Sequence, residues 1–195
     1  MEAHNSTKVN SRPIPKFLTL DEVEALYKAA RKYSRYPDRD VAILRLMFGH
    51  GLRVSELCNL ERASIIGDCE EICIHRLKAD SADVQALSPL EAKALRKYLK
   101  LKRRVDTRQF LFLTERGSQF SRQGVHRMVK AMGRHAGLGS VHPHRLRHAC
   151  GYHLVNQGEP MRFIQSYLGH KTEAMTLLYT QLSARKYDSI RTHFK

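Results

Sequence analysis

Acidic residues are scarce in this sequence of 195 residues: 19 aspartates and glutamates stand against 34 lysines and arginines. The resulting formal charge of +15 favours a polyanionic partner, most often a nucleic acid. A globular protein that surface charge merely keeps soluble is the alternative. Hydrophobic residues make up 42% of the chain, which is enough to bury the core of one domain of ordinary size.

Paired cysteines and long apolar runs are also missing. The four cysteines form no CxxC motif, and Cys58, Cys73 and Cys150 lie in apolar patterns, which predicts free, buried thiols in a reducing compartment. No apolar run reaches the roughly 18 residues of a membrane span, and residues 1–16 contain no apolar signal core. We therefore expect a cytoplasmic protein without a membrane partner.

Residues 1–16 are polar and are expected to form a flexible lead-in. Beyond them, apolar periodicity and capping residues predict mostly helices, with a short three-stranded antiparallel sheet in the middle of the chain. A turn is expected at 34–39. The expected helices begin at Thr19 and cover 40–48, 52–60, 89–103, 121–136, 143–156, 160–168 and 173–182; the expected strands are 63–66, 71–77 and 84–87.

The segment 142–179 contains an unusual concentration of residues suited to phosphate chemistry. His144 and Arg147 are three apart on an expected helix, so their side chains share one face. His170 and Tyr179 are nine apart and would lie on opposite faces of a straight helix, so a bend is needed, and Gly169 supplies a helix end there. Guanidinium groups bind anionic oxygens, imidazoles transfer protons, and a phenol is a possible nucleophile.

These motifs resemble those of the tyrosine recombinases. The chain reads GLRVSEL at 51–57, HxxR at 144–147, LGH at 168–170 and then Tyr179, in the order and spacing of that family, over about residues 17–182. The resemblance implies a mainly α-helical catalytic domain with a small three-stranded antiparallel sheet over residues 17–195, without a separate N-terminal core-binding domain. The sequence around the HxxR box most resembles that of the fimbrial phase-variation recombinases of enteric bacteria.

The family pattern implies a role for each matching residue. Arg53 and Arg147 would clamp the scissile phosphate, Tyr179 would attack it, and His144 would accept the phenolic proton. Taken singly, the arginines could serve surface ion pairs and Tyr179 could be an ordinary core residue. His170 would hydrogen-bond a phosphate oxygen, or merely cap the preceding helix.

Two further residues complete the implied site. Lys78, in the expected turn between the second and third strands, would protonate the leaving 5′-oxygen, although a lysine in such a turn is ordinarily just exposed. The turn departs from the commoner glycine-rich form of the family, and Arg76 is the other cation beside it. Glu56 would orient Arg53 or His144, or simply form a helical pair with Arg53.

DNA recognition is expected from the helix that Ser121 begins. Arg122 and Gln123 at its start suit guanine and adenine edges, while phosphate contact or plain solvation would explain them equally well. The implied partner is double-stranded DNA with inverted-repeat sites, bound by a homotetramer on synapsed DNA, with DNA-bending accessory proteins. The resemblance implies no cofactor, and a bacterial, nucleoid-associated location.

The implied function is inversion of a promoter-bearing DNA element, which would regulate transcription of fimbrial genes. Three alternatives remain open at this stage: relaxation of supercoils by a type IB topoisomerase, a DNA-binding transcription regulator with a non-catalytic recombinase fold, and a metal site. For the metal site, the spacing of His144, His148, Cys150 and His153 could suit zinc, but Arg147 among them opposes a cation.

Overall fold

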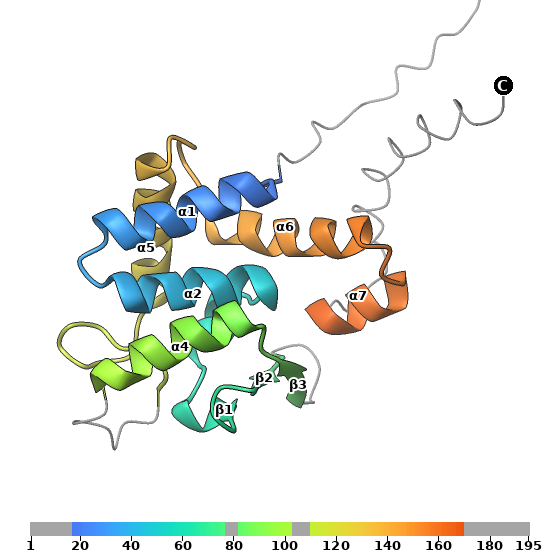
Figure 1. Cartoon of the computed structure of the whole chain (residues 1–195), viewed down its shortest axis with the longest axis horizontal. Coiled ribbons are helices and arrows are strands. Elements are labelled where there is room, and N and C mark those ends of the chain that lie inside the picture. Colours follow the sequence, from blue (N-terminus) through green and yellow to red (C-terminus); the bar gives the residue numbers. More distant parts are fainter. Residues whose placement is uncertain (1–16, 77–81, 103–109, 170–195) are drawn as a thin grey trace, which may run out of the picture.

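The computed structural model describes residues 17–76, 82–102 and 110–169. Within them it contains seven α-helices and one three-stranded antiparallel sheet, which confirms the expected fold class (Figure 1). The helices are α1 (Leu20–Tyr33), α2 (Pro37–Gly49), α3 (Val54–Cys58), α4 (Pro89–Lys102), α5 (Arg122–His135), α6 (Pro143–Asn156) and α7 (Met161–Leu168); the strands are β1 (Ile65–Ile66), β2 (Glu71–His75) and β3 (Ala82–Ala86).

Helix α2 forms the centre of the fold. Its Ile43, Leu44, Leu46 and Met47 are fully buried, and α1, α4 and α6 all pack against it. Figure 1 shows α1 and α4 on opposite sides of α2, with the sheet beyond α4. Each of these side chains contributes roughly 1.5–3 kcal/mol through its burial. The position of α2 is therefore firmly fixed, and with it the position of the chain that follows Gly49.

The expected helix starts are present at α1, α4 and α5. Thr19 and Glu22 form the expected capping box, with side chain to backbone distances of 2.8 and 3.2 Å. Ser88 and Glu91 do the same at the start of α4. Ser121 accepts a hydrogen bond from the Gly124 backbone, which caps α5. These helices begin where the sequence predicts because their caps are local interactions.

The sheet has the order β1–β2–β3, with Cys73 opposite Val84 in the central pair. Ile72 and Ile74 are fully buried, so one face of β2 points into the core. Side chains alternate between the faces of a strand, and the same inward phase continues to Arg76, directly after the strand. A cation therefore lies where the pattern places an apolar residue.

Four expectations about local structure were wrong. Residues 63–64 belong to a short 3₁₀ helix, Arg62–Ser64, so the first strand is only Ile65–Ile66. Residues 37–39 belong to α2 and not to a turn, because Pro37 occupies the first helical turn, where its missing N–H costs nothing. Helix α3 is shorter than 52–60, since Arg53 is extended and only caps it. Cys73 is half-buried because it points away from Ile72 and Ile74, while Cys69 is buried instead. All four cysteines are free thiols.

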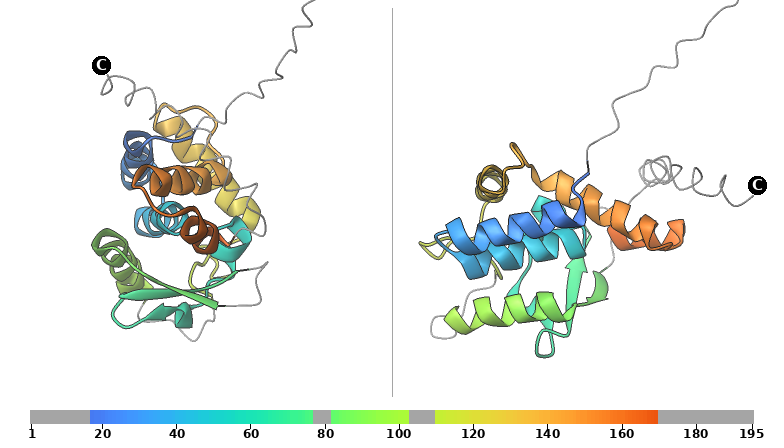
Figure 2. Two further views of the ribbon diagram at one scale, coloured as in Figure 1. Left: turned by 90° about the vertical axis from the view of Figure 1, so that its right-hand side faces the viewer. Right: turned by 45° about the horizontal axis from the view of Figure 1, so that its top comes forward.

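Helix α7 packs through a small second core. Ile164 and Leu168 are buried against Cys150 of α6, and both views in Figure 2 place α7 beside α6. Gly169 ends α7 in a left-handed conformation, with φ of 63°. This docking brings the C-terminal end of α7 next to the end of α2. Along the described part of the chain, no helix is both long and apolar enough to cross a membrane.

Candidate active site

Arg53 lies immediately before α3, where Glu56 holds it. The Arg53 backbone N–H donates to Glu56 Oε2 at 2.8 Å, and its Nη1 donates to Glu56 Oε1 at 2.6 Å. The Glu56 side chain is fully buried, whereas that of Arg53 is 19% exposed. Burial acts to raise the pKa of Glu56, but the Arg53 hydrogen bonds and the Arg76 charge outweigh burial and lower it. The carboxylate therefore stays ionised.

Arg147 reaches the same place from α6. Its Nη1 donates to Gly51 O at 2.5 Å, and its Nη2 donates to Leu168 O at 2.6 Å. Nη1 also lies 4.0 Å from Glu56 Oε2, and the Arg147 side chain is only 6% exposed. The structure thus brings Arg53 and Arg147, which are 94 positions apart in the sequence, to a single buried carboxylate.

The last carbonyls of α7 are bound by three arginines from three different parts of the chain. Tyr167 O accepts from Arg76 Nη2, Leu168 O accepts from Arg147, and Gly169 O accepts from Arg53 Nη2 at 2.8 Å. The final carbonyls of a helix have no partner within the helix and carry partial negative charge. The guanidinium groups satisfy that charge, and α7 in turn fixes where they lie.

Two glycines of the family motifs are required by close approaches. Gly51 has φ of 55°, and a Cβ added there would lie 2.3 Å from Leu168 Cδ2. Gly169 has φ of 63°, and an added Cβ would lie 3.0 Å from Arg76 Cδ. Only glycine adopts a left-handed conformation without strain and leaves this space. The first arginine box and the end of α7 therefore touch each other through glycine.

Arg76 is part of this cluster, although the sequence interpretation treated it only as a neighbour of Lys78. Its side chain is 2% exposed, and its Nη1 donates to Glu56 Oε2 at 3.2 Å. Its Nη2 also donates to His50 O at 3.2 Å. One signal could have revealed it: Arg76 shares the inward phase of Ile72 and Ile74, and a buried cation requires a carboxylate partner.

His144 lies in the first turn of α6 with its side chain exposed. Partial removal from water, followed by the charges of His142 and Arg147, lowers its pKa below the ordinary 6.5; Arg53 adds to the effect. The pKa values of His142 and His148 are lowered too, in each case first by desolvation. These imidazoles are therefore neutral near pH 7, and a neutral imidazole accepts a proton.

Arg122 and Gln123 open α5 with both side chains exposed. Helix α5 contacts α3, which follows Arg53. Both side chains are free to reach a partner outside the protein. Lys78, His170 and Tyr179 lie outside the described residues, so the structure gives no position for these three expected site residues.

The zinc alternative has no support among the described residues. There, no group of three or more His, Cys, Asp or Glu side chains is placed to hold an ion. Cys150, which the zinc alternative requires, is buried and directs its Sγ to Gly49 O at 3.5 Å. Burial raises the pKa of this thiol to about 12, which disfavours the thiolate that a metal needs.

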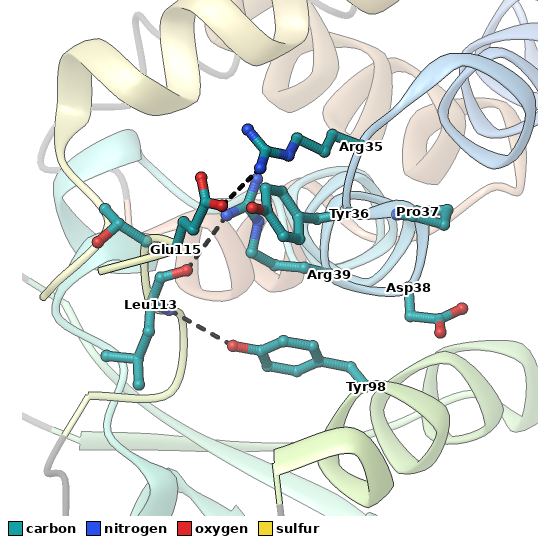
Figure 3. A pocket seen from close by; sticks show the side chains of 9 residues that line it. Arg35, Tyr36, Pro37, Asp38, Arg39, Tyr98, Leu113 and Glu115 are labelled. Atoms are coloured by element: carbon teal, nitrogen blue, oxygen red, sulfur yellow. Dashed lines mark hydrogen bonds and ion pairs between the residues drawn. The ribbon is translucent and has the colours of Figure 1, made fainter. Parts of the chain in front are cut away.

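A separate pocket of about 270 Å³ lies at the other end of α2 (Figure 3). Arg39 there donates to Leu113 O at 3.2 Å and pairs with Asp40 at 2.8 Å, and its guanidinium lies over the rings of Tyr36 and Phe120. Figure 3 also shows the exposed pair of Arg35 and Glu115. Arg39 is thus a partly buried arginine in an ion pair at the far end of α2 from the site.

Comparison with known proteins shows the family to which this chain is similar. The family model described as "Phage integrase family" matches residues 16–186. The type 1 fimbriae regulatory protein FimB of Escherichia coli strain K12 is 36% identical over 177 residues, which cover 89% of this chain and 88% of FimB.

Solved structures agree with the family match. The crystal structure of XerA recombinase has a TM-score of 0.80 and 31% identity, covering 94% of this chain and 66% of that one. The XerH site-specific recombinase bound to palindromic difH substrate, in a post-cleavage complex, shares the fold, with a TM-score of 0.79 at 19% identity over 92% of this chain and 53% of that one. Fold and relatives together define a tyrosine-type site-specific recombinase. The chain belongs to the phage integrase family.

Proposed function

We propose that this recombinase cuts and rejoins double-stranded DNA at a phosphate held between Arg53 and Arg147. The observation that carries the proposal is the convergence of these two guanidiniums on the buried Glu56 carboxylate, at distances of 2.6 and 4.0 Å. A planar guanidinium matches the oxygens of a phosphate. Two of them fixed by one carboxylate are ready to bind the charge that develops on those oxygens.

The proposed reaction conserves the energy of the phosphodiester. Tyr179 Oη bonds to phosphorus, the bond to the 5′-oxygen breaks, and a 3′-phosphotyrosine remains. The phenolic proton passes to His144, and Lys78 protonates the 5′-oxygen as it leaves. His170 hydrogen-bonds a phosphate oxygen. Attack by another 5′-hydroxyl reverses these steps on a new strand, so neither a nucleotide nor a cofactor is consumed.

The described residues support this division of roles. The lowered pKa of His144 keeps its imidazole neutral and able to take the phenolic proton. Tyr167, which lies near the site, donates its hydroxyl to Gly49 O at 2.9 Å, and burial raises its pKa. That hydroxyl is occupied inside the protein and resists ionisation, which favours Tyr179 as the nucleophile.

The net charge of the chain and its similarity to FimB and FimE support a proposal for DNA binding and for its biological role. The formal charge of +15 suits a duplex, and Arg122 and Gln123 are exposed at the start of α5 to read base edges. FimB and FimE carry the name of type 1 fimbriae regulatory proteins. We infer that this recombinase inverts a promoter-bearing element between inverted repeats for fimbrial phase variation. It would act as a homotetramer on synapsed DNA in the nucleoid, with DNA-bending proteins.

Tyr179→Phe tests the proposal. The change removes one oxygen and no charge, so DNA binding in a gel shift should persist. A suicide substrate nicked near the cleavage point should trap the wild-type protein on the 3′ side of the break and should not trap the variant. An adduct with the variant would assign the nucleophile to another tyrosine. Loss of DNA binding would make Tyr179 a structural residue.

A chelator separates this chemistry from a metal-dependent nuclease. Arginines supply the charge that metal ions supply in many nucleases, so adduct formation should be unchanged in excess chelator and without nucleotide. Loss of the adduct with the chelator, and its return with added zinc, would contradict the proposal.

A further inference from the structure

The buried guanidinium of Arg76 connects the parts of the site that come from distant segments. It donates to Glu56 Oε2, to His50 O at the end of α2, and to Tyr167 O in the last turn of α7. Glu56 is also the carboxylate that holds Arg53. Arg76 therefore contacts the residue that orients Arg53 and the helix end to which Arg53 itself is bonded.

A purely structural ion pair is the competing explanation. Buried ion pairs seldom stabilise a fold more than apolar residues of the same size would. Stability alone thus gives little reason for a third arginine at this carboxylate. Within the described part of the chain, the buried Arg76 Nε has no hydrogen-bond partner, so the fold tolerates one unsatisfied donor at this place.

The charge balance of the cluster suggests a role for this third arginine. Arg53, Arg76 and Arg147 surround the single carboxylate of Glu56, with nitrogen to oxygen distances of 2.6, 3.2 and 4.0 Å. Over the described residues, three guanidiniums and one carboxylate give this cluster a net charge of +2. A phosphodiester carries one negative charge and an attacking phenolate brings a second, so the transition state is a dianion. The two charges match it in a site of low dielectric constant.

We propose that Arg76 is a positioning residue for DNA cleavage, which holds Glu56 and the end of α7 so that Arg53 stays aimed at the phosphate and which supplies part of the positive potential there. The inference rests on the proposed function. It concerns a residue that acts through Glu56 and α7, without touching DNA.

Three variants test it: Arg76→Met, which removes the charge at similar length, Arg76→Lys, which keeps the charge, and Arg39→Met as the matched control. Arg39 is also an arginine in an ion pair, with its side chain 11% exposed, but it lies at the far end of α2. Single-turnover adduct formation on a suicide substrate is measured well below the lowest Tm of the set, beside gel-shift affinity. Arg76→Met should cleave about 100-fold more slowly with DNA affinity nearly unchanged, and Arg39→Met should cleave normally.

A second substrate distinguishes positioning charge from packing. A methylphosphonate at the scissile position replaces one non-bridging oxygen with a neutral methyl group, so the transition state carries one negative charge fewer. The rate deficit of Arg76→Met should shrink about tenfold on this substrate. Arg76→Lys should keep the wild-type preference for phosphate, and so should Arg39→Met, because a fault in packing does not sense the charge of the substrate.

The cleavage rates of these variants either support or overturn the positioning role of Arg76. A wild-type rate for Arg76→Met overturns the inference, and so does a slow variant whose preference for phosphate is unchanged. If Arg76→Met does not fold, Arg76→Lys decides, because it keeps the charge but loses the guanidinium fork that holds Glu56 and the Tyr167 carbonyl. Slower cleavage with unchanged DNA affinity supports the positioning role, and a wild-type cleavage rate overturns it. Absence of any adduct with the wild-type protein would contradict the proposed function itself, and with it this inference.

Discussion

Glu56 binds Arg53 twice, once through the Arg53 backbone N–H and once through its guanidinium. Replacing Glu56 with Gln keeps the shape but removes the charge that two further arginines share. We expect a loss of about 3 kcal/mol in unfolding free energy, because buried guanidiniums are left unpaired. Adduct formation should fall by at least about tenfold. Chemical denaturation and single-turnover cleavage measure the two effects.

The same carboxylate predicts a dependence of stability on pH. The folded protein lowers the pKa of Glu56 below its ordinary 4.5, so the ionised carboxylate stabilises the fold above that value. The contribution should disappear as the pH falls through the lowered pKa. The difference in stability between wild type and Glu56→Gln should therefore be constant from pH 7 to about 5 and decrease in more acidic solution. A difference that grew on acidification would contradict this assignment.

Gly51→Ala should disrupt the site more than its size suggests. The new Cβ would meet Leu168 Cδ2 at 2.3 Å and would also strain a backbone with φ of 55°. Gly137→Ala is the matched control, since its φ is 73° but nothing lies within 4 Å of the added Cβ. Both variants should lose about 1 kcal/mol for the backbone, and Gly51→Ala should lose more, together with cleavage. Equal Tm values for the two would show that α7 simply moves aside.

Proton transfer to His144 should set the acid limb of the cleavage rate. Desolvation and the neighbouring charges lower its pKa below 6.5, and only the neutral imidazole accepts a proton. The pH at which the cleavage rate falls to half its plateau value should therefore lie below 6.5. His144→Gln should lower the plateau about 100-fold and abolish the decline. A rate for the wild-type protein that keeps rising above pH 7 would assign the base elsewhere.

Arg122→Ala and Gln123→Ala separate base reading from phosphate binding. If these side chains read bases, each change should reduce the preference for the recombination site over random DNA, by about 1–3 kcal/mol, with little effect on affinity for random DNA. Binding should also weaken steeply and log-linearly with salt for all variants. An unchanged preference in both would show that other residues read the sequence.

Local rules were enough to predict much of the helical framework. The helix starts depend on residues only a few positions apart, so short stretches of sequence are enough to predict them. They are the capping boxes at Thr19 and Ser88, the cap at Ser121 and the prolines of α4 and α6. The same local rule applies to Pro37, which occupies the first helical position of α2, although a turn is expected there from the sequence.

The interior of the site was less predictable. The family motifs pointed to Arg53 and Arg147, and both meet at Glu56. The role of Arg76 could not be predicted because its partners are 20, 26 and 91 positions away. Local sequence patterns do not indicate contacts over such separations. Burial of a cation depends on the whole arrangement of carboxylates and carbonyls around it, which exists only after the chain has folded.

The three arginines at the end of α7 have a consequence for the order of assembly. They belong to the segments before α3, after β2 and within α6. Each donates to a different carbonyl at the end of α7, from 116, 91 and 21 positions away in the sequence. Contacts of this kind form late, because the chain must close long loops before it gains them. A growing chain on the ribosome thus cannot complete the arginine cluster until α7 has emerged and docked. Under the proposed function, cleavage of DNA would therefore require the completed fold.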